Sequence, residues 1–143
     1  MRHELDSAYW ALRVGIGLTA FLAGLDKYFD LLADWPMYLN PLALAVVPVG
    51  AETFMRVVGV VEMGVGLAIL SGWTRLGAYV ASLWLLGIAL NLVTMGRFLD
   101  VAVRDVGLSI AAFTLARLAE VREPASERDA TRARVPGALR TQA

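Results

Sequence analysis

Hydrophobic residues are concentrated in four runs, each interrupted by a few polar positions, at residues 8–31, 54–72, 75–95 and 99–119. A helix of about 20 mostly apolar residues is long enough to cross the hydrocarbon core of a bilayer. The run at 75–95 fits this length and composition best, while the run at 99–119 contains Arg104 and Asp105 and fits them least. The pattern predicts an all-α integral membrane protein built as a four-helix bundle.

The connections between the runs predict how the helices are joined. "SGWT" and "GRF" are long enough only for tight turns, so the helices that they join are antiparallel neighbours. The first connection, residues 32–52, contains Pro36, Pro41 and Pro48, and prolines at this density break a helix. It is nevertheless apolar and contains Trp35 and Tyr38, residue types of the membrane–water interface. We expect this proline-rich segment to be interfacial and to cover one mouth of the bundle, rather than to form an ordinary exposed loop.

The composition supports a membrane environment. Hydrophobic residues make up 58% of the 143 residues and the mean hydropathy is +0.61, whereas soluble domains contain roughly 45–50% apolar residues. The formal net charge is zero, which gives no reason to expect nucleic acid as a partner. The chain has no cysteine, so it cannot form disulfides or ligate an iron–sulfur cluster by itself.

The two ends of the chain are more polar than its middle. Beyond Arg122 the sequence lacks a helical apolar period, so we predict a transmembrane domain at 1–122 and a polar, flexible tail at 123–143. The N-terminal stretch does not resemble a cleaved signal peptide, so we expect the first run to be kept as a helix. More Lys and Arg flank the spans on the side of the termini than on the side of Arg97. This bias predicts a multi-pass protein of the cell membrane with both termini in the cytoplasm.

Charged residues inside the predicted spans are costly, because a central Asp, Lys or Arg costs roughly 2.5–3.5 kcal/mol on insertion scales. Such residues usually face the interior of a bundle. Here they share one face of each helix with small residues, which permit close packing in lipid. These faces comprise Arg13, Gly17, Ala20, Gly24 and Lys27 in the first span, Arg56, Gly59, Glu62 and Gly66 in the second, Trp84, Gly87 and Asn91 in the third, and Arg104, Leu108, Ala111 and Ala112 in the fourth.

The depths of the polar residues along the spans predict a ligand pocket in the outer half of the bundle, with Glu62 at its floor. We expect six side chains to bind a ligand or exchange a proton there, namely Glu62, Arg56, Arg104, Lys27, Asp105 and Asn91. The alternative is structural, with buried ion pairs that fix helix register and long side chains that reach for the interface. A cation close to Glu62 would favour the structural alternative, and an open cavity beside it would favour a functional site.

The residues present exclude several kinds of chemistry. The single histidine, His3, precedes the first span, so one chain cannot supply two histidine ligands to a buried haem. The sequence contains no cluster of metal ligands, no Walker motif and no dinucleotide fingerprint. We therefore expect no metal site, no covalently bound cofactor and no catalytic residue. Membership of a larger assembly fits the chain better than independent catalysis.

Three stretches match the motifs of one membrane-protein family. "LRVGIGLTAFLAGLDK" ends in Gly24 and Lys27, and "VRDVGLSIAAFTLA" contains Arg104 and Asp105. "VVEMGVGLAILSGWTRLGAYVAS" contains a second set of motif positions, which are Glu62, Gly64, Gly66, Gly72, Thr74 and Arg75. In their order and separation the three stretches resemble the DoxX-like family, which includes small-subunit-like proteins of thiosulfate:quinone oxidoreductase. The resemblance covers roughly residues 8–120.

The resemblance implies a four-helix membrane protein that serves as a subunit of a quinone-linked redox complex or an oxidative-stress complex. One family member belongs to an archaeal thiosulfate:quinone oxidoreductase, and mycobacterial members are tied to superoxide dismutase and a sulfurtransferase. The resemblance thus implies quinone as a ligand and redox proteins as partners, beside the lipid bilayer and a possible second copy of the chain. Two alternatives stay open: a non-enzymatic scaffold or assembly factor that anchors soluble partners through its arginine-bearing tail, and a small transporter.

Overall fold

The computed structural model describes the backbone of residues 2–134 and the side chains of residues 3–122. Within these residues all regular structure is helical, which confirms the predicted all-α class. The elements are α1 (Arg2–Asp26), the short 3-10 helix η1 (Trp35–Tyr38), α2 (Pro41–Val46), α3 (Ala51–Leu70), α4 (Thr74–Met95) and α5 (Leu99–Arg134).

Three of the described helices are long and apolar enough to cross a membrane, over His3–Asp26, Ala51–Leu70 and Thr74–Met95. They agree with the predicted membrane environment and with three of the four predicted spans. α5 is not among them, and three charged residues, Asp100, Arg104 and Asp105, lie in its first two turns. The place of α5 as a fourth span stays a prediction.

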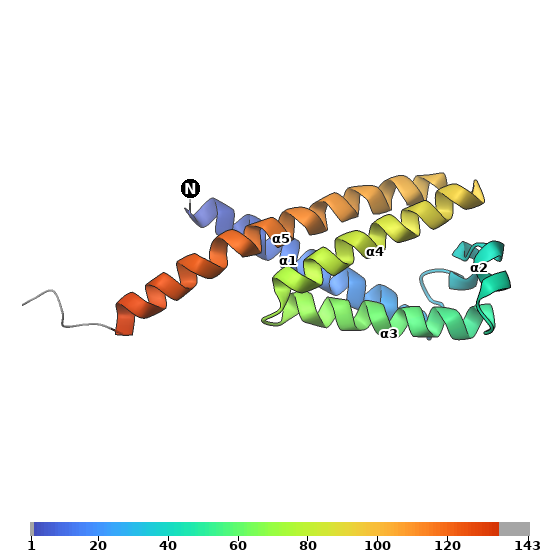
Figure 1. The fold of residues 1–143 in the computed structure, drawn as a ribbon, viewed down its shortest axis with the longest axis horizontal. Helices are drawn as coiled ribbons and strands as arrows, with labels where there is room; N and C mark the ends of the chain where they lie inside the picture. Colours follow the sequence, from blue (N-terminus) through green and yellow to red (C-terminus); the bar gives the residue numbers. More distant parts are fainter. Residues whose placement is uncertain (1, 135–143) are drawn as a thin grey trace, which may run out of the picture.

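The four long helices lie in two pairs (Figure 1). α1 packs along α3 and α4 packs along α5, and the pairs meet where α3 contacts α4 and where α1 contacts α5. The pairs lie close together at the α3–α4 turn and diverge toward the opposite end, where η1 and α2 lie. The helices are therefore furthest apart beside the proline-rich segment.

Glycines bring the backbones of α1 and α3 into direct contact. A Cβ atom on Gly24 would lie 2.5 Å from the carbonyl oxygen of Gly59, and a Cβ on Gly66 would lie 2.7 Å from the carbonyl oxygen of Gly17. Real Cβ atoms do not approach backbone this closely, so only glycine fits at these crossing points. The contacts confirm the small-residue faces predicted for the first two spans. They also show that α1 and α3 are antiparallel, because Gly24 meets the earlier glycine of α3 and Gly17 the later one.

α4 and α5 pack through alanine and serine rather than glycine. The hydroxyls of Ser82 and Ser109 lie 3.0 Å apart, and the Ser109 hydroxyl also donates to the carbonyl oxygen of Ser82 at 2.8 Å. The prediction that Gly87 packs against a neighbouring helix is wrong, since the position of its missing Cβ has no contact within 4 Å. The face of α5 that is buried consists of Ala102, Asp105, Ser109, Ala112, Leu115, Ala116 and Ala119.

Two sets of hydrogen bonds hold the proline-rich segment across the open end of the helices. The Asp26 carboxylate accepts bonds from the backbone N–H groups of Leu31 and Leu32 and from the indole of Trp35. These bonds end α1 at Asp26, although the apolar run continues to residue 31. On the other side, the Asn91 amide donates to the carbonyl oxygen of Tyr38 at 2.8 Å. The segment thus contains two short helices and is bonded to Asp26 and to α4, while its role as a cover stays a prediction.

Arg13 ties α1 to the end of α3. Its guanidinium donates to the carbonyl oxygen of Ile69 at 3.0 Å and to that of Leu70 at 2.8 Å. The last carbonyls of a helix have no partner within the helix, and apolar surroundings make unpaired carbonyls costly. Arg13 therefore satisfies the C-terminus of α3, a specific role that its position on an apolar helix face did not reveal.

The backbone of α5 continues past the predicted domain boundary at residue 122 and ends at Arg134. The first part of the predicted tail is therefore helical, because residues 123–134 add to α5 without a break. Figure 1 shows this part of α5 projecting beyond the other helices. The rest of the predicted tail, residues 135–143, lies outside the described residues.

Candidate functional site

A buried ion pair joins the C-terminal end of α1 to the middle of α3. The ammonium of Lys27, the first residue after α1, lies 2.6 Å from Oε2 of Glu62 in α3. The two side chains are only 3% and 10% exposed. We refer to Lys27 and Glu62 as the central ion pair.

Two tryptophans complete the surroundings of the central ion pair. The indole N–H of Trp84 in α4 donates to Oε1 of Glu62 at 3.3 Å. The ammonium of Lys27 lies 3.7 Å from the centre of the Trp35 ring, a distance typical of a cation–π contact. Both carboxylate oxygens of Glu62 therefore have donors, and the lysine charge is shared between a carboxylate and an aromatic face.

Glycine packing positions the central ion pair. Gly24 lies one turn before Lys27, and Gly59 lies one turn before Glu62, so the point where the two backbones touch is next to both charged side chains. The Cβ atom of Lys27 would lie 3.2 Å from a Cβ on Gly59. Gly59 therefore makes room for the lysine stem as well as for the backbone of α1.

Asp105 in α5 is a further buried charge, in addition to Asp26, Lys27 and Glu62. It is 3% exposed. Arg104, in contrast, is 63% exposed along its side chain and reaches back to Asp105, with Nη2 2.9 Å from Oδ1. The prediction that Arg104 faces the interior is wrong, because adjacent residues point about 100° apart around a helix and Asp105 takes the inward direction.

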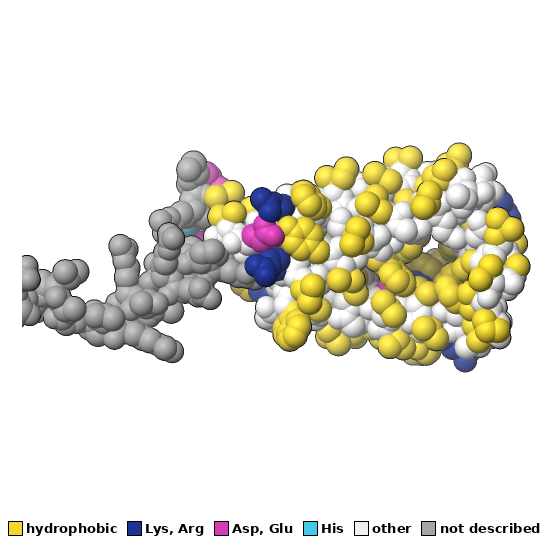
Figure 2. Space-filling model, viewed as in Figure 1, with side chains coloured by type: hydrophobic (Ala, Val, Ile, Leu, Met, Phe, Trp, Pro, Cys, Tyr) yellow, Lys and Arg dark blue, Asp and Glu magenta, His cyan; other side chains and the backbone are white. Residues whose placement is uncertain are grey.

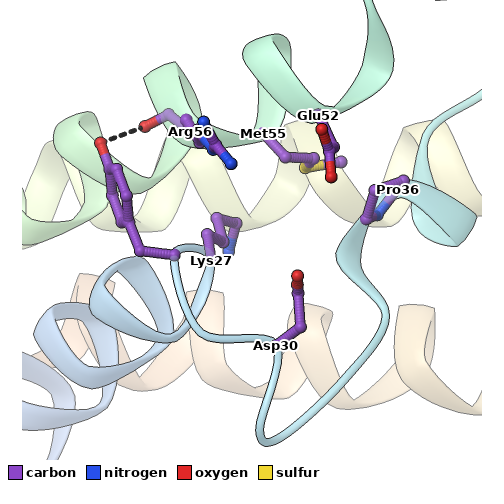
Figure 3. A pocket seen from close by; sticks show the side chains of 7 residues that line it. Lys27, Asp30, Pro36, Glu52, Met55 and Arg56 are labelled. Carbon is purple, nitrogen blue, oxygen red and sulfur yellow. Dashed lines mark hydrogen bonds between the residues drawn. The ribbon is translucent and has the colours of Figure 1, made fainter.

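A small cavity opens beside Lys27 and leads to the surface at the end of the helices (Figure 3). Its volume is about 20 Å³, which is enough for about one water molecule. Arg56 lies at its wall, and the hydroxyl of Tyr28 donates to the Arg56 carbonyl oxygen at 3.0 Å. The lining residues are Lys27, Tyr28, Asp30, Pro36, Glu52, Met55 and Arg56.

The six predicted site residues thus do not form one cluster. Lys27 and Glu62 form the central ion pair, and Asp105 is buried on α5, where it pairs with Arg104. Arg56 lies at the cavity near the surface, and the side chain of Arg104 is exposed. Asn91 bonds to the proline-rich segment instead of the ion pair, because its amide N–H donates to the Tyr38 carbonyl oxygen and its Oδ1 accepts from the Asn40 N–H at 3.3 Å. Two further residues contact the ion pair and were outside the predicted set, Trp35 and Trp84.

Of the two features that were set against each other in the sequence, a cation close to Glu62 and an open cavity beside it, the structure shows the cation. Lys27 lies within hydrogen-bond distance of Glu62, as a structural pair requires. The small cavity that opens at the surface is lined by Lys27 and not by Glu62. In addition, Figure 2 shows a hollow between α3 and α4 on the half of the molecule nearer α2.

The chemistry available in this region is hydrogen bonding and proton exchange. Among the described residues, no three His, Asp or Glu side chains gather in a way that could hold a metal ion. Lys27 and Trp84 are donors, whereas Glu62 and Asp105 are acceptors when ionised. Such a set can bind a polar head group and can pass a proton to it or take one from it.

Comparison with known proteins gave no relative of this chain: no family model, no curated protein and no solved structure matches it. The resemblance to the DoxX-like family therefore stays a prediction from the three sequence motifs.

Proposed function

We propose that this chain is a DoxX-like integral membrane protein of four helices that binds the polar head of a quinone or a related small ligand beside the central ion pair. In this proposal it acts as a subunit of a redox or oxidative-stress complex and depends on partner proteins for electrons. The observation that carries the proposal is the position of Lys27 and Glu62, buried together between apolar helices and next to two tryptophans.

Stability alone is a weak explanation for the central ion pair. Removing two charges from water costs about as much as their attraction returns, so a buried ion pair adds little net stability compared with apolar side chains of the same size. In lipid, charged side chains within spans are typical of ligand or proton pathways. The cavity beside Lys27 supports such a role, because it lets water reach the edge of the pair.

The donor set fits the head group of a quinone. Its carbonyl oxygens accept hydrogen bonds, which Lys27 and Trp84 can donate, and Glu62 can exchange a proton with the bound molecule. The cavity of about 20 Å³ is too small for a quinone ring. We therefore place the ring in the hollow between α3 and α4, on the side from which Trp84 contacts Glu62.

The proposal includes α5 as the fourth span. Its buried face packs on α4, while Val103, Ile110 and Phe113 are 49–73% exposed and offer apolar surface to lipid. Arg104 lies near the start of α5, where its long side chain can reach the interface. With four spans both termini lie in the cytoplasm, and the proline-rich segment lies on the outer side.

Binding of a short-chain ubiquinone analogue to purified protein in detergent tests the proposed function. Replacing Glu62 by Gln removes the charge that orients Lys27 and Trp84. Loss of one hydrogen bond to a charged group costs about 1.5–3 kcal/mol, so we expect the Kd of Glu62→Gln to rise about tenfold or more.

The matched control is Asp100→Asn, which makes the same carboxylate-to-amide change on the exposed first turn of α5. We expect this variant to bind like the original protein. Equal Kd values for Glu62→Gln and the original protein would refute the proposal. Gel filtration and thermal unfolding of each variant verify that the proteins compared are folded.

A further inference from the structure

The space between α3 and α4 widens from the turn that joins them toward the opposite end. Near the turn the two helices are in contact, since a Cβ atom on Gly77 of α4 would lie 2.9 Å from the backbone nitrogen of Ile69 in α3. In the second half of α4, a Cβ atom on Gly87 would meet nothing within 4 Å. The hollow in Figure 2 lies between the same two helices, on the half of the molecule nearer α2.

Gly87 lies between two side chains that both reach beyond α4. It follows Trp84 by three residues and precedes Asn91 by four, so the three residues share one face of the helix. Trp84 donates to Oε1 of Glu62 at 3.3 Å, and Asn91 donates to the carbonyl oxygen of Tyr38 at 2.8 Å. Gly87 is therefore the floor of a recess, with the central ion pair on one side of it and the proline-rich segment on the other.

Neither packing nor backbone conformation requires glycine at position 87. The glycines between α1 and α3 are needed because the two backbones touch, and Gly96 has a φ of 66°. Gly87 has neither property, and glycine is less favourable than alanine inside a helix. Open space is also found at three other glycines within helices, Gly15, Gly64 and Gly107. What distinguishes Gly87 is its neighbour Trp84, which contacts the central ion pair.

The recess at Gly87 is open to lipid, whereas the end of the helices is not open to a molecule of ring size. The cavity beside Lys27 holds about one water molecule, and Pro36 of the proline-rich segment lies in its wall. On α4, Leu83 and Leu90 lie one turn on either side of Gly87 and are 71% and 65% exposed. Because α3 and α4 are both apolar enough to span a bilayer, these leucines are suited to contact lipid.

We propose that the quinone reaches the central ion pair laterally from the lipid, between α3 and α4, and that its ring lies against Gly87 while its apolar tail remains in the lipid. This inference rests on the proposed function and names the residue that determines which ring fits. A ring in the recess lies next to Trp84, the donor that reaches Glu62. A larger side chain at position 87 would occupy the space of the ring.

Filling the recess tests the lateral route. We expect Gly87→Leu to raise the Kd of the short-chain ubiquinone analogue about tenfold or more, because overfilled sites exclude their occupant. Gly87→Ala fills less of the recess and should cause a smaller rise. Alanine and leucine both favour a helix over glycine, so the melting temperatures of the two variants should equal or exceed that of the original protein.

The matched control is Gly64→Leu, the same substitution at a glycine of α3 that also has nothing within 4 Å. Two residues span about 200° around a helix, so Gly64 lies on the face of α3 opposite Glu62. We expect its Kd to equal that of the original protein. An unchanged Kd in Gly87→Leu, or equal losses in Gly87→Leu and Gly64→Leu, would refute the lateral route.

The outcomes separate this inference from the proposed function. Normal binding by Gly87→Leu together with weak binding by Glu62→Gln would refute the lateral route and leave the proposed function in place. Absence of binding by the original protein would refute both.

Photo-crosslinking gives a second measurement that does not depend on a variant. A ubiquinone analogue with an azido group on its ring is activated by light, and mass spectrometry locates the attachment. We expect attachment within residues 84–91 of α4. Attachment confined to the proline-rich segment would show entry at the end of the helices and would overturn the lateral route.

Discussion

At the scale of single residues, each of the buried side chains Lys27, Glu62 and Asp105 has an oppositely charged partner, which offsets the free energy needed to remove a charge from water. Glu62 and Lys27 were both identifiable from the sequence, because an ionised side chain in an apolar run stands out. Their partnership was not identifiable, since it depends on how α1 and α3 are placed along each other. The same holds for Arg104 and Asp105: both were visible as charges, and only the packing of α5 on α4 decides that Asp105 points inward.

The central ion pair predicts that the loss of stability caused by replacing Lys27 depends on whether the Glu62 carboxylate is present. Replacing Lys27 alone by Met leaves the Glu62 carboxylate buried without its cation, and breaking a buried pair costs about 3–5 kcal/mol. Replacing both residues by Met removes both charges, so we expect the double variant to regain most of the lost stability. Thermal unfolding of the single and double variants in detergent measures this coupling.

If the losses of stability in the two single variants simply add in the double variant, the result would contradict the pairing of Lys27 with Glu62. Recovery in the double variant together with loss of quinone binding would agree with both the pairing and the proposed function.

At the scale of elements, the sequence pattern was most informative where packing requires glycine. The faces of small residues in the first two spans predict the contact between α1 and α3, because close approach of two helices in lipid needs small side chains at regular spacing. The same reasoning fails at Gly87, because α4 turns a different face, with Ala78, Ala81 and Ser82, toward its neighbours. A small residue permits close packing but does not require it.

Alanine substitutions in α3 separate packing glycines from other glycines. Gly59→Ala places a Cβ atom 2.6 Å from the carbonyl oxygen of Gly24, which forces α1 and α3 apart and is expected to cost about 1–3 kcal/mol. Gly64→Ala, in the same helix, meets nothing within 4 Å. It should stabilise α3 by up to about 1 kcal/mol, because alanine favours the helix.

The melting temperatures of the two α3 variants in detergent provide the measurement. A lower value for Gly59→Ala and an equal or higher value for Gly64→Ala are expected. Similar destabilisation by both substitutions would show that the contact between α1 and α3 does not depend on Gly59.

The proline-rich segment shows the limit of prediction for an irregular element. Its prolines and aromatic residues predict an interfacial segment that covers one end of the helices, and the structure shows two short helices, η1 and α2, beside the diverging ends of the long helices (Figure 1). The residues that hold it, Asp26 and Asn91, could not be recognised beforehand. Their bonds go mostly to backbone groups, which every residue possesses, so the sequence contains no signal for the partner.

At the scale of the whole molecule, the number of spans decides where the termini lie. Three helices qualify as membrane spans by length and composition. α5 packs against α4 and α1, but it is not among these candidate spans. The sequence could predict the apolar runs. It could not show that α5 turns Asp105 inward and continues to Arg134, because the end of a helix in polar sequence has no apolar period to mark it.

Cysteine labelling in intact cells tests the predicted topology, because the 143 residues contain no cysteine and each variant purified after labelling therefore has a single reactive thiol. Single cysteines are placed at Leu42 in α2, at Ser7 in α1 and after the last residue, Ala143. We expect a membrane-impermeant maleimide to label the Leu42→Cys variant in intact cells. The Ser7→Cys variant and the variant with the appended cysteine should be labelled only after lysis.

Labelling of the appended cysteine in intact cells, with Ser7→Cys protected, would show an odd number of spans and would exclude α5 as a membrane-crossing helix. Labelling of Ser7→Cys in intact cells would reverse the predicted orientation.

The bonds of Arg13 also bear on how the protein is made. Arg13 lies near the middle of α1 and Lys27 directly follows its last residue, and their partners are the last carbonyls of α3 and the carboxylate of Glu62. Both sets of partners belong to a segment that the ribosome has not yet released when α1 first emerges. If α1 were alone in lipid, Arg13 and Lys27 would lack both sets of partners, and each unpaired charge inside the bilayer is costly. We therefore expect stable insertion of α1 to be completed only when α3 arrives, so that the two helices enter the bilayer together.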